Sequence, residues 1–457
     1  MNGTPRDIAG KRVAVVGLGR TGAAAARLLQ SRGAEVLVTD STTSDAHQTA
    51  AAALRAEGIE VEIGGHSAGA FSDADLIVLS PGVPPRMAPL HAARDRGVPI
   101  ISELELAWPF ARAPIFAVTG TNGKTTTTEL LTHLLRTEGR EVVLAGNNDL
   151  PLSEAVRLYE PPAAYVVEVS SYQLESIETF APKAAAVLNL TPDHFGRHTD
   201  MTEYARVKAQ IFAYQVPGCT AIVNADDAWT TGMAVPAGVR RVTIGLDHDA
   251  DWRVDGGLIL HGGDALLAAA ELQLPGRHNL YNVLAALALA ECAGVKPRHA
   301  AQHATRFRGV EHRIEFVLEA GGVKYYNDSK STNVDSLRVA LESFAEPVVL
   351  IVGGRGKGSP YEALLPEVQA HVKAAVLIGE DAPALEAAWG GTVETARAES
   401  MDASVRAAAG LASPGMVVLL SPGCASFDWY GNFEERGRDF KACVQRLASP
   451  ASAVQEG

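Results

Sequence analysis

Cysteine is scarce and scattered in this sequence. The 457 residues include only Cys219, Cys292, Cys424 and Cys443, and none are spaced as C-x-x-C. This spacing argues against a disulfide framework and against a cysteine-based zinc site. A reducing compartment such as the cytoplasm fits this usage.

Long apolar runs and an excess of basic residues are also missing. No stretch approaches the ~18 apolar residues needed to span a bilayer, and the N-terminus lacks the pattern of an export signal. The formal net charge of −13 argues against a basic surface for DNA or RNA. We therefore expect a cytoplasmic protein with neither a membrane nor a nucleic-acid partner.

The composition is that of an α/β protein rich in turns. Apolar residues make up 47% and charged residues 20%, with 43 glycines and 24 prolines. A chain of this length suggests about three domains.

The first glycine motif follows a predicted buried strand over residues 12–16. Gly17, Gly19 and Gly22 form a G-x-G-x-x-G turn, and Asp40 follows about 20 positions on, as in dinucleotide-binding folds. Alone, this motif would indicate a dehydrogenase, or a turn that binds no ligand. A later strand, 75–79, also ends in small residues at Ser80 and Gly82, so this third of the chain is expected to bind a nucleotide-like group.

The second glycine motif is a predicted phosphate loop. A buried strand over 115–118 leads into Gly120 and Gly123, then into Lys124 and Thr125 at the start of a helix. Backbone N–H groups and the lysine would hold phosphate, and the threonine hydroxyl would bind magnesium. The first glycine of the common G-x-x-x-x-G-K-[ST] pattern is missing, and the alternative is a glycine turn with an exposed lysine.

Three later strands deliver polar groups to the same sheet edge. They end at Asn147, at Glu168, and at Asp193 with His194. Oxygen ligands from Thr125 and Glu168, with the imidazole of His194, could hold magnesium beside a triphosphate. Each residue by itself could instead be structural.

Lys208 lies in the apolar face of a predicted helix over 201–215. Burial there would favour a neutral, nucleophilic amine. The alternative is a packed stem with the ammonium reaching water.

Further candidates come from the helix after residue 276 and from the last third. Asn279 and Asn282 open that helix, and one of them could recognise adenine. Arg313 could contact phosphate, and Lys357 with Ser426 could hold a carboxylate, although Lys357 could also be a solvated loop residue. The carboxylates at 226–227 are interpreted as solvated turn residues without a chemical role.

Taken in order, the motifs resemble those of the Mur ligases. The matching stretches cover nearly the whole chain, at 120–126, 168–175, 189–194, 276–282, 312–313 and 327–333. The resemblance implies an α/β fold of three domains: a Rossmann-like UDP-sugar domain over 1–107, a central P-loop ATPase-like parallel sheet over 108–309, and a Rossmann-like C-terminal domain over 310–457.

The resemblance also implies an activity. The stretches around Asp328 to Lys330 and 420–428 look like those of the family branch that joins D-glutamate to UDP-N-acetylmuramoyl-L-alanine for peptidoglycan, with ATP, two magnesium ions and a lysine carbamate formed from CO2. A monomer is expected.

The resemblance assigns roles residue by residue. For catalysis it implies Lys124, His194 and Lys208. For ATP it implies Gly120, Thr121, Asn122, Gly123, Lys124, Thr125, Thr126, Asn279, Asn282, Arg313, Asp328 and Lys330. For the UDP-sugar it implies Gly17, Gly19, Arg20, Thr21, Asp40, Ser41, Ser80, Gly82, Asn147, Ser170 and Gln173. For D-glutamate it implies Thr332, Lys357, Ser426 and Phe433, and for metal Thr125, Glu168, His194 and carbamylated Lys208.

Two positions depart from the family pattern, Asn148-Asp149 and Gly196. Three alternatives to this ligase activity are a nicotinamide dehydrogenase, a nucleotide switch without ligase activity, and a related ligase. The related ligase would add another amino acid or extend folate with glutamate.

Overall fold

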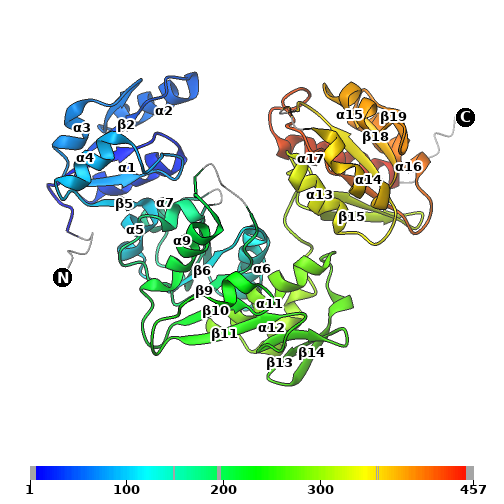
Figure 1. The fold of residues 1–457 in the computed structure, drawn as a ribbon, viewed down its shortest axis with the longest axis horizontal. Helices are drawn as coiled ribbons and strands as arrows, with labels where there is room; N and C mark the ends of the chain where they lie inside the picture. Colours follow the sequence, from blue (N-terminus) through cyan, green and yellow to red (C-terminus); the bar gives the residue numbers. More distant parts are fainter. Residues whose placement is uncertain (1–6, 148–149, 193–196, 357, 359, 449–457) are drawn as a thin grey trace, which may run out of the picture. The chain divides into compact units, whose positions relative to one another are not determined.

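The apolar strands of this chain assemble into three sheets within the described residues. The structure is a computed structural model that describes residues 7–147, 150–192, 197–356, 358 and 360–448. It forms two compact units (Figure 1). The first comprises Met1–Ala269 and Leu280–Ala304, and the second comprises Ala270–Asn279 and Thr305–Gly457.

The first sheet is parallel and five-stranded, in the order β3-β2-β1-β4-β5. Side chains of its central strand alternate between two cores, with Val13 and Val15 on one face and Ala14 and Val16 on the other. Its strands are β1 (Arg12–Val16), β2 (Glu35–Asp40), β3 (Glu60–Ile63), β4 (Leu76–Leu79) and β5 (Ile100–Ser102). Its helices are α1 (Arg20–Ser31), α2 (Asp45–Ala56), α3 (Ala68–Ser72) and α4 (Ala88–Asp95).

The second sheet has nine strands, in the order β14-β13-β12-β11-β10-β9-β6-β8-β7. It is parallel except for an antiparallel meander, β12-β13-β14, at one edge. Its strands are β6 (Ile115–Thr119), β7 (Val142–Gly146), β8 (Ala164–Glu168), β9 (Ala184–Val187), β10 (Thr220–Asn224), β11 (Arg240–Gly245), β12 (Trp252–Asp255), β13 (Leu258–His261) and β14 (Asp264–Ala268).

Helices follow these strands along the chain. They are α6 (Lys124–Thr137), α7 (Leu152–Leu158), α8 (Ser171–Leu174), α9 (Met201–Ala213), α10 (Ala228–Thr231), α11 (Arg277–Cys292) and α12 (Pro297–Ala304).

The third sheet lies in the second unit, in the order β15-β16-β20-β17-β18-β19. One core contains residues of α13, α14 and α15 and another contains residues of α16 and α17, so helices cover both faces. The strands are β15 (Glu315–Ala320), β16 (Val323–Asn327), β17 (Val348–Gly353), β18 (Val372–Ile378), β19 (Glu394–Arg397) and β20 (Val417–Leu420). The helices are α13 (Val334–Glu342), α14 (Leu365–His371), α15 (Ala382–Trp389), α16 (Met401–Leu411) and α17 (Phe433–Ala448).

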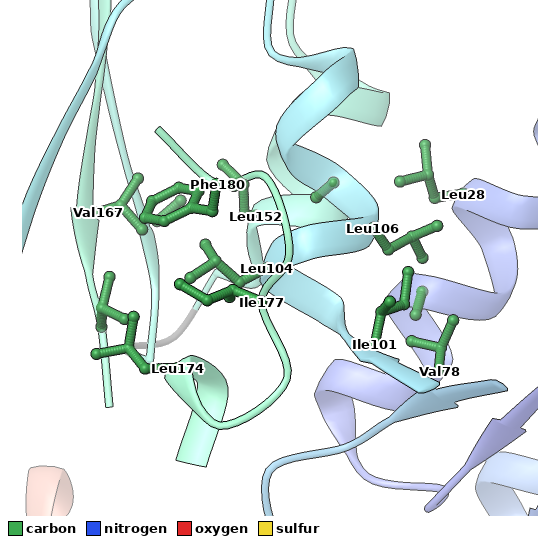
Figure 2. Packing of buried hydrophobic residues seen from close by; sticks show 14 of the residues in the cluster. Leu28, Val78, Ile101, Leu104, Leu106, Leu152, Val167, Leu174, Ile177 and Phe180 are labelled. Carbon is green, nitrogen blue, oxygen red and sulfur yellow. The ribbon is translucent and has the colours of Figure 1, made fainter. Parts of the chain in front are cut away.

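A short helix, α5 (Glu103–Ala107), joins the cores of the first two sheets. Figure 2 shows Leu106 directed toward Leu28 and Ile101, while Leu104 is directed toward Ile177 and Phe180. These residues belong to one continuous cluster. The apolar contact therefore holds the two sheets of the first unit together.

Two buried carboxylates strengthen this junction. Glu105 accepts hydrogen bonds from the N–H groups of Glu178 and Phe180, each at 3.0 Å. Glu103 accepts one from the Ser153 N–H at 2.5 Å, and complete burial raises the pKa of Glu103. Side chains of α5 thus hydrogen-bond to segments of the second sheet, although the second side-chain oxygen of Glu103 is buried without a partner in the described residues.

The predicted fold class is confirmed: an α/β protein of three sheets that are largely parallel. The predicted boundaries at 107 and 309 stay predictions. The sequence analysis did not recognise β3, β5, β11, β19 or the meander β12 to β14, because strands this short give too few residues for a clear apolar period.

Candidate active site

A cavity of about 450 Å³ lies at the carboxyl-terminal edge of the first sheet. The strand order reverses between β1 and β4, which is where open parallel sheets bind ligands. Of the residues predicted for the UDP-sugar, those that line it are Gly17, Gly19, Arg20, Thr21, Asp40, Ser41, Ser80, Gly82 and Asn147. Asn147 comes from the end of β7, so the second sheet contributes to this cavity.

The first glycine turn has the close backbone contacts that its spacing predicts. A Cβ atom on Gly22 would lie 1.9 Å from the Gly17 oxygen, so only glycine fits there. The Asp40 carboxylate accepts the N–H groups of Leu18 and Thr42, both at 2.7 Å. Burial raises the pKa of Asp40, but these N–H groups outweigh that effect and hold it below its usual range.

Ser170 and Gln173 do not line this cavity. They form the capping box of α8, in which the Ser170 hydroxyl accepts the Gln173 N–H and the Gln173 side chain accepts the Ser170 N–H. Their predicted ligand role stays a prediction. The sequence analysis missed His66 and Met87, which line the cavity. Recognition of β3 would have indicated His66, because this residue follows the carboxyl-terminal end of that strand.

The second glycine motif is a loop between β6 and α6 whose carbonyl oxygens accept hydrogen bonds from the side chain of Lys124. Gly120 and Gly123 have φ angles of 153° and 85°, and the Lys124 ammonium donates to the carbonyl oxygens of Gly120 and Thr121 at 2.9 and 2.8 Å. Asn189 braces the loop because its side chain accepts the Asn122 N–H at 2.9 Å. The N-terminus of a 14-residue helix therefore faces a loop of defined shape, as anion binding requires.

Gly123 has no side chain, and Asn282 approaches the position that a Cβ atom would take. A Cβ atom there would lie 2.1 Å from the Asn282 side-chain oxygen, which comes from α11. This asparagine therefore lies against the loop. Asn279, on the same helix, donates from its side chain to the Pro275 oxygen at 2.6 Å.

Glu168 presents one side-chain oxygen that has no hydrogen-bond partner within the described part of the chain. The residue is 4% exposed at the end of β8. Its Oε1 accepts from Asn147 Nδ2 at 3.1 Å, while Oε2 is buried without a partner. A buried, unpartnered carboxylate oxygen fits a divalent cation, because such a group otherwise loses its hydration without compensation.

Lys208 is buried on α9, with an exposed fraction of 1%. Its Nζ donates to the Gly120 oxygen at 2.9 Å and to Thr119 Oγ1 at 3.3 Å. It also lies 4.9 Å from the centre of the Tyr204 ring. The predicted apolar placement is confirmed, and the alternative in which the ammonium reaches water is wrong.

Some predicted residues lie outside the described residues. They are Asp193, His194, Lys357, Asn148, Asp149 and Gly196, so their roles stay predictions.

In the second unit, Arg313 lies in a strained segment and is partly exposed, while Asp328 is buried. His312 and Ile314, on either side of Arg313, have φ angles of 64° and 44°. Asp328 accepts from the Ile314 N–H at 3.2 Å and from Ser421 Oγ at 2.7 Å. Burial raises the pKa of Asp328 to about 7, although these donors and Arg313 oppose the shift.

Lys330 and Phe433 lie close together in the same unit, with the Lys330 Nζ 5.8 Å from the ring centre. Ser426 is 3% exposed on the loop after β20, and Thr332 is partly exposed ahead of α13. Nearby Glu311, His312 and Glu315 could in principle hold a metal. Lys441 donates to both glutamates at 2.6 and 2.9 Å, so we assign them an ion-pair role instead.

The structure corrects the interpretation of Asp226 as a solvated turn residue. Asp226 is not solvated: its carboxylate accepts from the N–H groups of Leu246 and Asp247, at 2.5 and 3.0 Å, and from Tyr281 Oη at 2.8 Å. Burial opposes ionisation, but these donors, together with His248, lower the pKa of Asp226 to about 2. The residue therefore organises the turn that joins β11 to the meander.

The structure is that of an α/β protein with two glycine-rich loops between a strand and a helix, and matches to three family models identify its family. They describe the MurD-like N-terminal domain at residues 11–102, the Mur ligase middle domain at 118–290, and the Mur ligase glutamate ligase domain at 312–424. The chain belongs to the Mur ligase family.

Relatives that align with nearly the whole chain share one protein name. Proteins named UDP-N-acetylmuramoylalanine–D-glutamate ligase are 42% identical in Pelotomaculum thermopropionicum and 44% identical in Salinibacter ruber. Each alignment covers 97% of this chain, with 99% and 100% of the relative. The UDP-N-acetylmuramate-alanine ligase structure from Thermotoga maritima shares the fold, with a TM-score of 0.57 at 20% identity over 96% of this chain and 100% of that one. In the described residues, no helix is long and apolar enough to cross a membrane.

Proposed function

We propose that this chain is the ATP-dependent ligase that joins D-glutamate to UDP-N-acetylmuramoyl-L-alanine in peptidoglycan precursor synthesis. The observation that carries the proposal is the 42–44% identity, over nearly the whole length, to relatives with that named activity. The protein is proposed to act as a monomer in the cytoplasm.

The proposed chemistry overcomes the low electrophilicity of a carboxylate. The alanyl carboxylate attacks the γ-phosphorus of ATP and displaces ADP, which gives an acyl phosphate. The amine of D-glutamate then attacks the acyl carbon, a tetrahedral intermediate forms, and inorganic phosphate leaves as the amide is made. Phosphorylation replaces a poor leaving oxygen with phosphate, and cationic groups reduce the repulsion between the anionic reactants.

The phosphate loop supports the ATP role. Lys124 and the first N–H groups of α6 would contact the phosphates, while Thr125 lies in the first turn where its hydroxyl can approach a metal. Asn282 lies against Gly123 and would contact the nucleotide. The family resemblance assigns Arg313, Asp328 and Lys330 to ATP as well.

Magnesium fits the residues present. The unpartnered Glu168 Oε2 and the Thr125 hydroxyl would hold one ion, and His194 with a carbamylated Lys208 would hold a second. Magnesium would neutralise phosphate charge. Lys208 supports the carbamate proposal because its amine is buried beside the loop.

The cavity of the first sheet is proposed to hold the UDP-sugar. Its glycine turn and strand-end N–H groups suit a diphosphate, and its volume of about 450 Å³ is of the size that small ligands occupy. Asn147 would connect this substrate to Glu168, to which it donates a hydrogen bond. Thr332, Lys357, Ser426 and Phe433 are proposed to recognise D-glutamate.

The test is phosphate release with ATP, magnesium and UDP-N-acetylmuramoyl-L-alanine in the presence of D-glutamate, L-alanine, L-lysine or diaminopimelate. We expect release with D-glutamate to exceed release with each of the others. Equal release, or preference for another amino acid, would identify a sister ligase and reject this assignment. Hydroxylamine trapping of the acyl phosphate tests the mechanism separately.

A further inference from the structure

Arg436 is a buried cation beneath the strand ends of the third sheet. It lies on α17 and is 1% exposed. Burial lowers its pKa to about 10, so the guanidinium remains charged at neutral pH. Burying an ion costs free energy unless other groups compensate, so the contacts of the guanidinium must offset that cost.

The guanidinium connects two loops at the carboxyl-terminal edge of that sheet. Its Nε donates to Ser329 Oγ at 3.1 Å and one terminal nitrogen donates to the Ser329 oxygen at 2.9 Å, on the loop after β16. The same nitrogen donates to the Cys424 oxygen at 3.1 Å, on the loop after β20. All three acceptors are uncharged, and the negative charges of Asp428 and Asp328 act on the cation at longer range and oppose the lowering of its pKa.

The remaining nitrogen, Nη1, lies against a third loop. A Cβ atom on Gly354, just after β17, would lie 3.2 Å from Nη1, and Nη1 is buried without a hydrogen-bond partner in the described residues. Arg355 and Ala425 exchange main-chain hydrogen bonds of 2.9 and 3.0 Å, which join this loop to the one after β20. One side chain therefore contacts the strand-end loops of three adjacent strands.

These loops carry residues assigned to the amino acid and the nucleotide. Ser426 follows Cys424 by two positions, and Lys330 follows Ser329 directly. Phe433 begins α17, and its carbonyl oxygen accepts from Ser329 Oγ at 2.8 Å. A shift of the guanidinium would displace all three positions together.

We propose that Arg436 is a positioning residue for the acidic amino-acid substrate, because it sets the spacing of the three strand-end loops that carry residues assigned to that substrate. This inference rests on the proposed function. Arg436 acts through the loops because its own atoms are enclosed.

The test compares Arg436→Met and Arg436→Lys with Arg438→Met, which removes the same charge from an exposed position of the same helix. We measure KM for D-glutamate, KM for UDP-N-acetylmuramoyl-L-alanine, kcat and the melting temperature. KM does not depend on the folded fraction, so a poorly folding Arg436→Met remains informative, and Arg436→Lys provides a second variant.

We expect Arg436→Met to raise KM for D-glutamate about tenfold or more, because charge-assisted hydrogen bonds are lost. KM for the UDP-sugar should change by less than about twofold, since its proposed residues belong to the other unit. Arg436→Lys should give a smaller rise, because the charge remains but the planar fork is lost. Arg438→Met should match the wild type.

Two results would overturn the inference: an unchanged KM for D-glutamate in both Arg436 variants, or the same rise in Arg438→Met. If the wild type prefers a neutral amino acid, the proposed function and this inference both fail. If the wild type prefers D-glutamate and the variants match it, only the inference fails.

Discussion

Lys124 and Lys208 donate hydrogen bonds to the same acceptor, the main-chain oxygen of Gly120. Both distances are 2.9 Å, although the two lysines come from different helices, α6 and α9. Two amines are thereby anchored at one point of the proposed phosphate loop. We expect both to be needed for turnover, for different reasons that can be separated.

Lys124→Met should lower kcat/KM for ATP by about 100-fold or more, because it removes the cation that is proposed to contact the phosphates. Lys183→Met is the matched control, since Lys183 is exposed and donates to the Gly218 oxygen. Steady-state kinetics with varied ATP provide the measurement. An equal loss in both variants would contradict a specific role for Lys124.

Lys208→Ala should abolish measurable turnover, and added acetate or formate should restore part of it by replacing the proposed carbamate. Chloride at the same ionic strength is the control, because it lacks the paired oxygen ligands of a carboxylate. Full activity without any added carboxylate would reject the catalytic proposal for Lys208.

Gly22→Ala should lower the melting temperature, because its Cβ atom would lie 1.9 Å from the Gly17 oxygen and the backbone would have to move. Overpacking of this kind costs about 1–3 kcal/mol. Gly19→Ala is the control, since no atom lies within 4 Å of its Cβ position. Thermal unfolding followed by circular dichroism compares the two, and equal melting temperatures would contradict the predicted clash.

Asp328→Asn should change how stability depends on pH. The folded-state pKa of about 7 exceeds the ordinary 3.8, so the folded protein binds this proton more tightly than the unfolded chain. The wild type should therefore lose stability relative to the variant as pH rises from about 4 to about 7, by at most about 1.4 kcal/mol per pH unit. Urea unfolding at several pH values measures the difference, and a constant difference would contradict the shift.

Local patterns predicted most of the chemistry-bearing segments. The glycine turn at Gly17 and the loop at Gly120 both lie where a strand meets a helix, because glycine spacing and apolar periodicity are properties of adjacent residues. The dehydrogenase interpretation needed only the first of these motifs. Membership of the Mur ligase family accounts for both.

Patterns failed where side chains act over long sequence separations. Asp226 was interpreted as solvated because its acceptor role depends on residues at 246–248 and on Tyr281. The sequence analysis did not identify Arg436, because an arginine on a charged helix is usually exposed. Only packing of α17 against the third sheet reveals its burial.

The sequence by itself determined the α/β class, the two glycine loops and the family, since these follow from local spacing and ordered motifs. Only the tertiary structure decided which distant side chains complete the sites: Asn147 in the cavity of the first sheet, Asn189 against the phosphate loop and Arg436 beneath three strand ends. Arg436 and Ser329 are 107 positions apart, and the contact forms because the sheet brings their segments together. The periodicity of either segment reports its own buried face and carries no information about its partner.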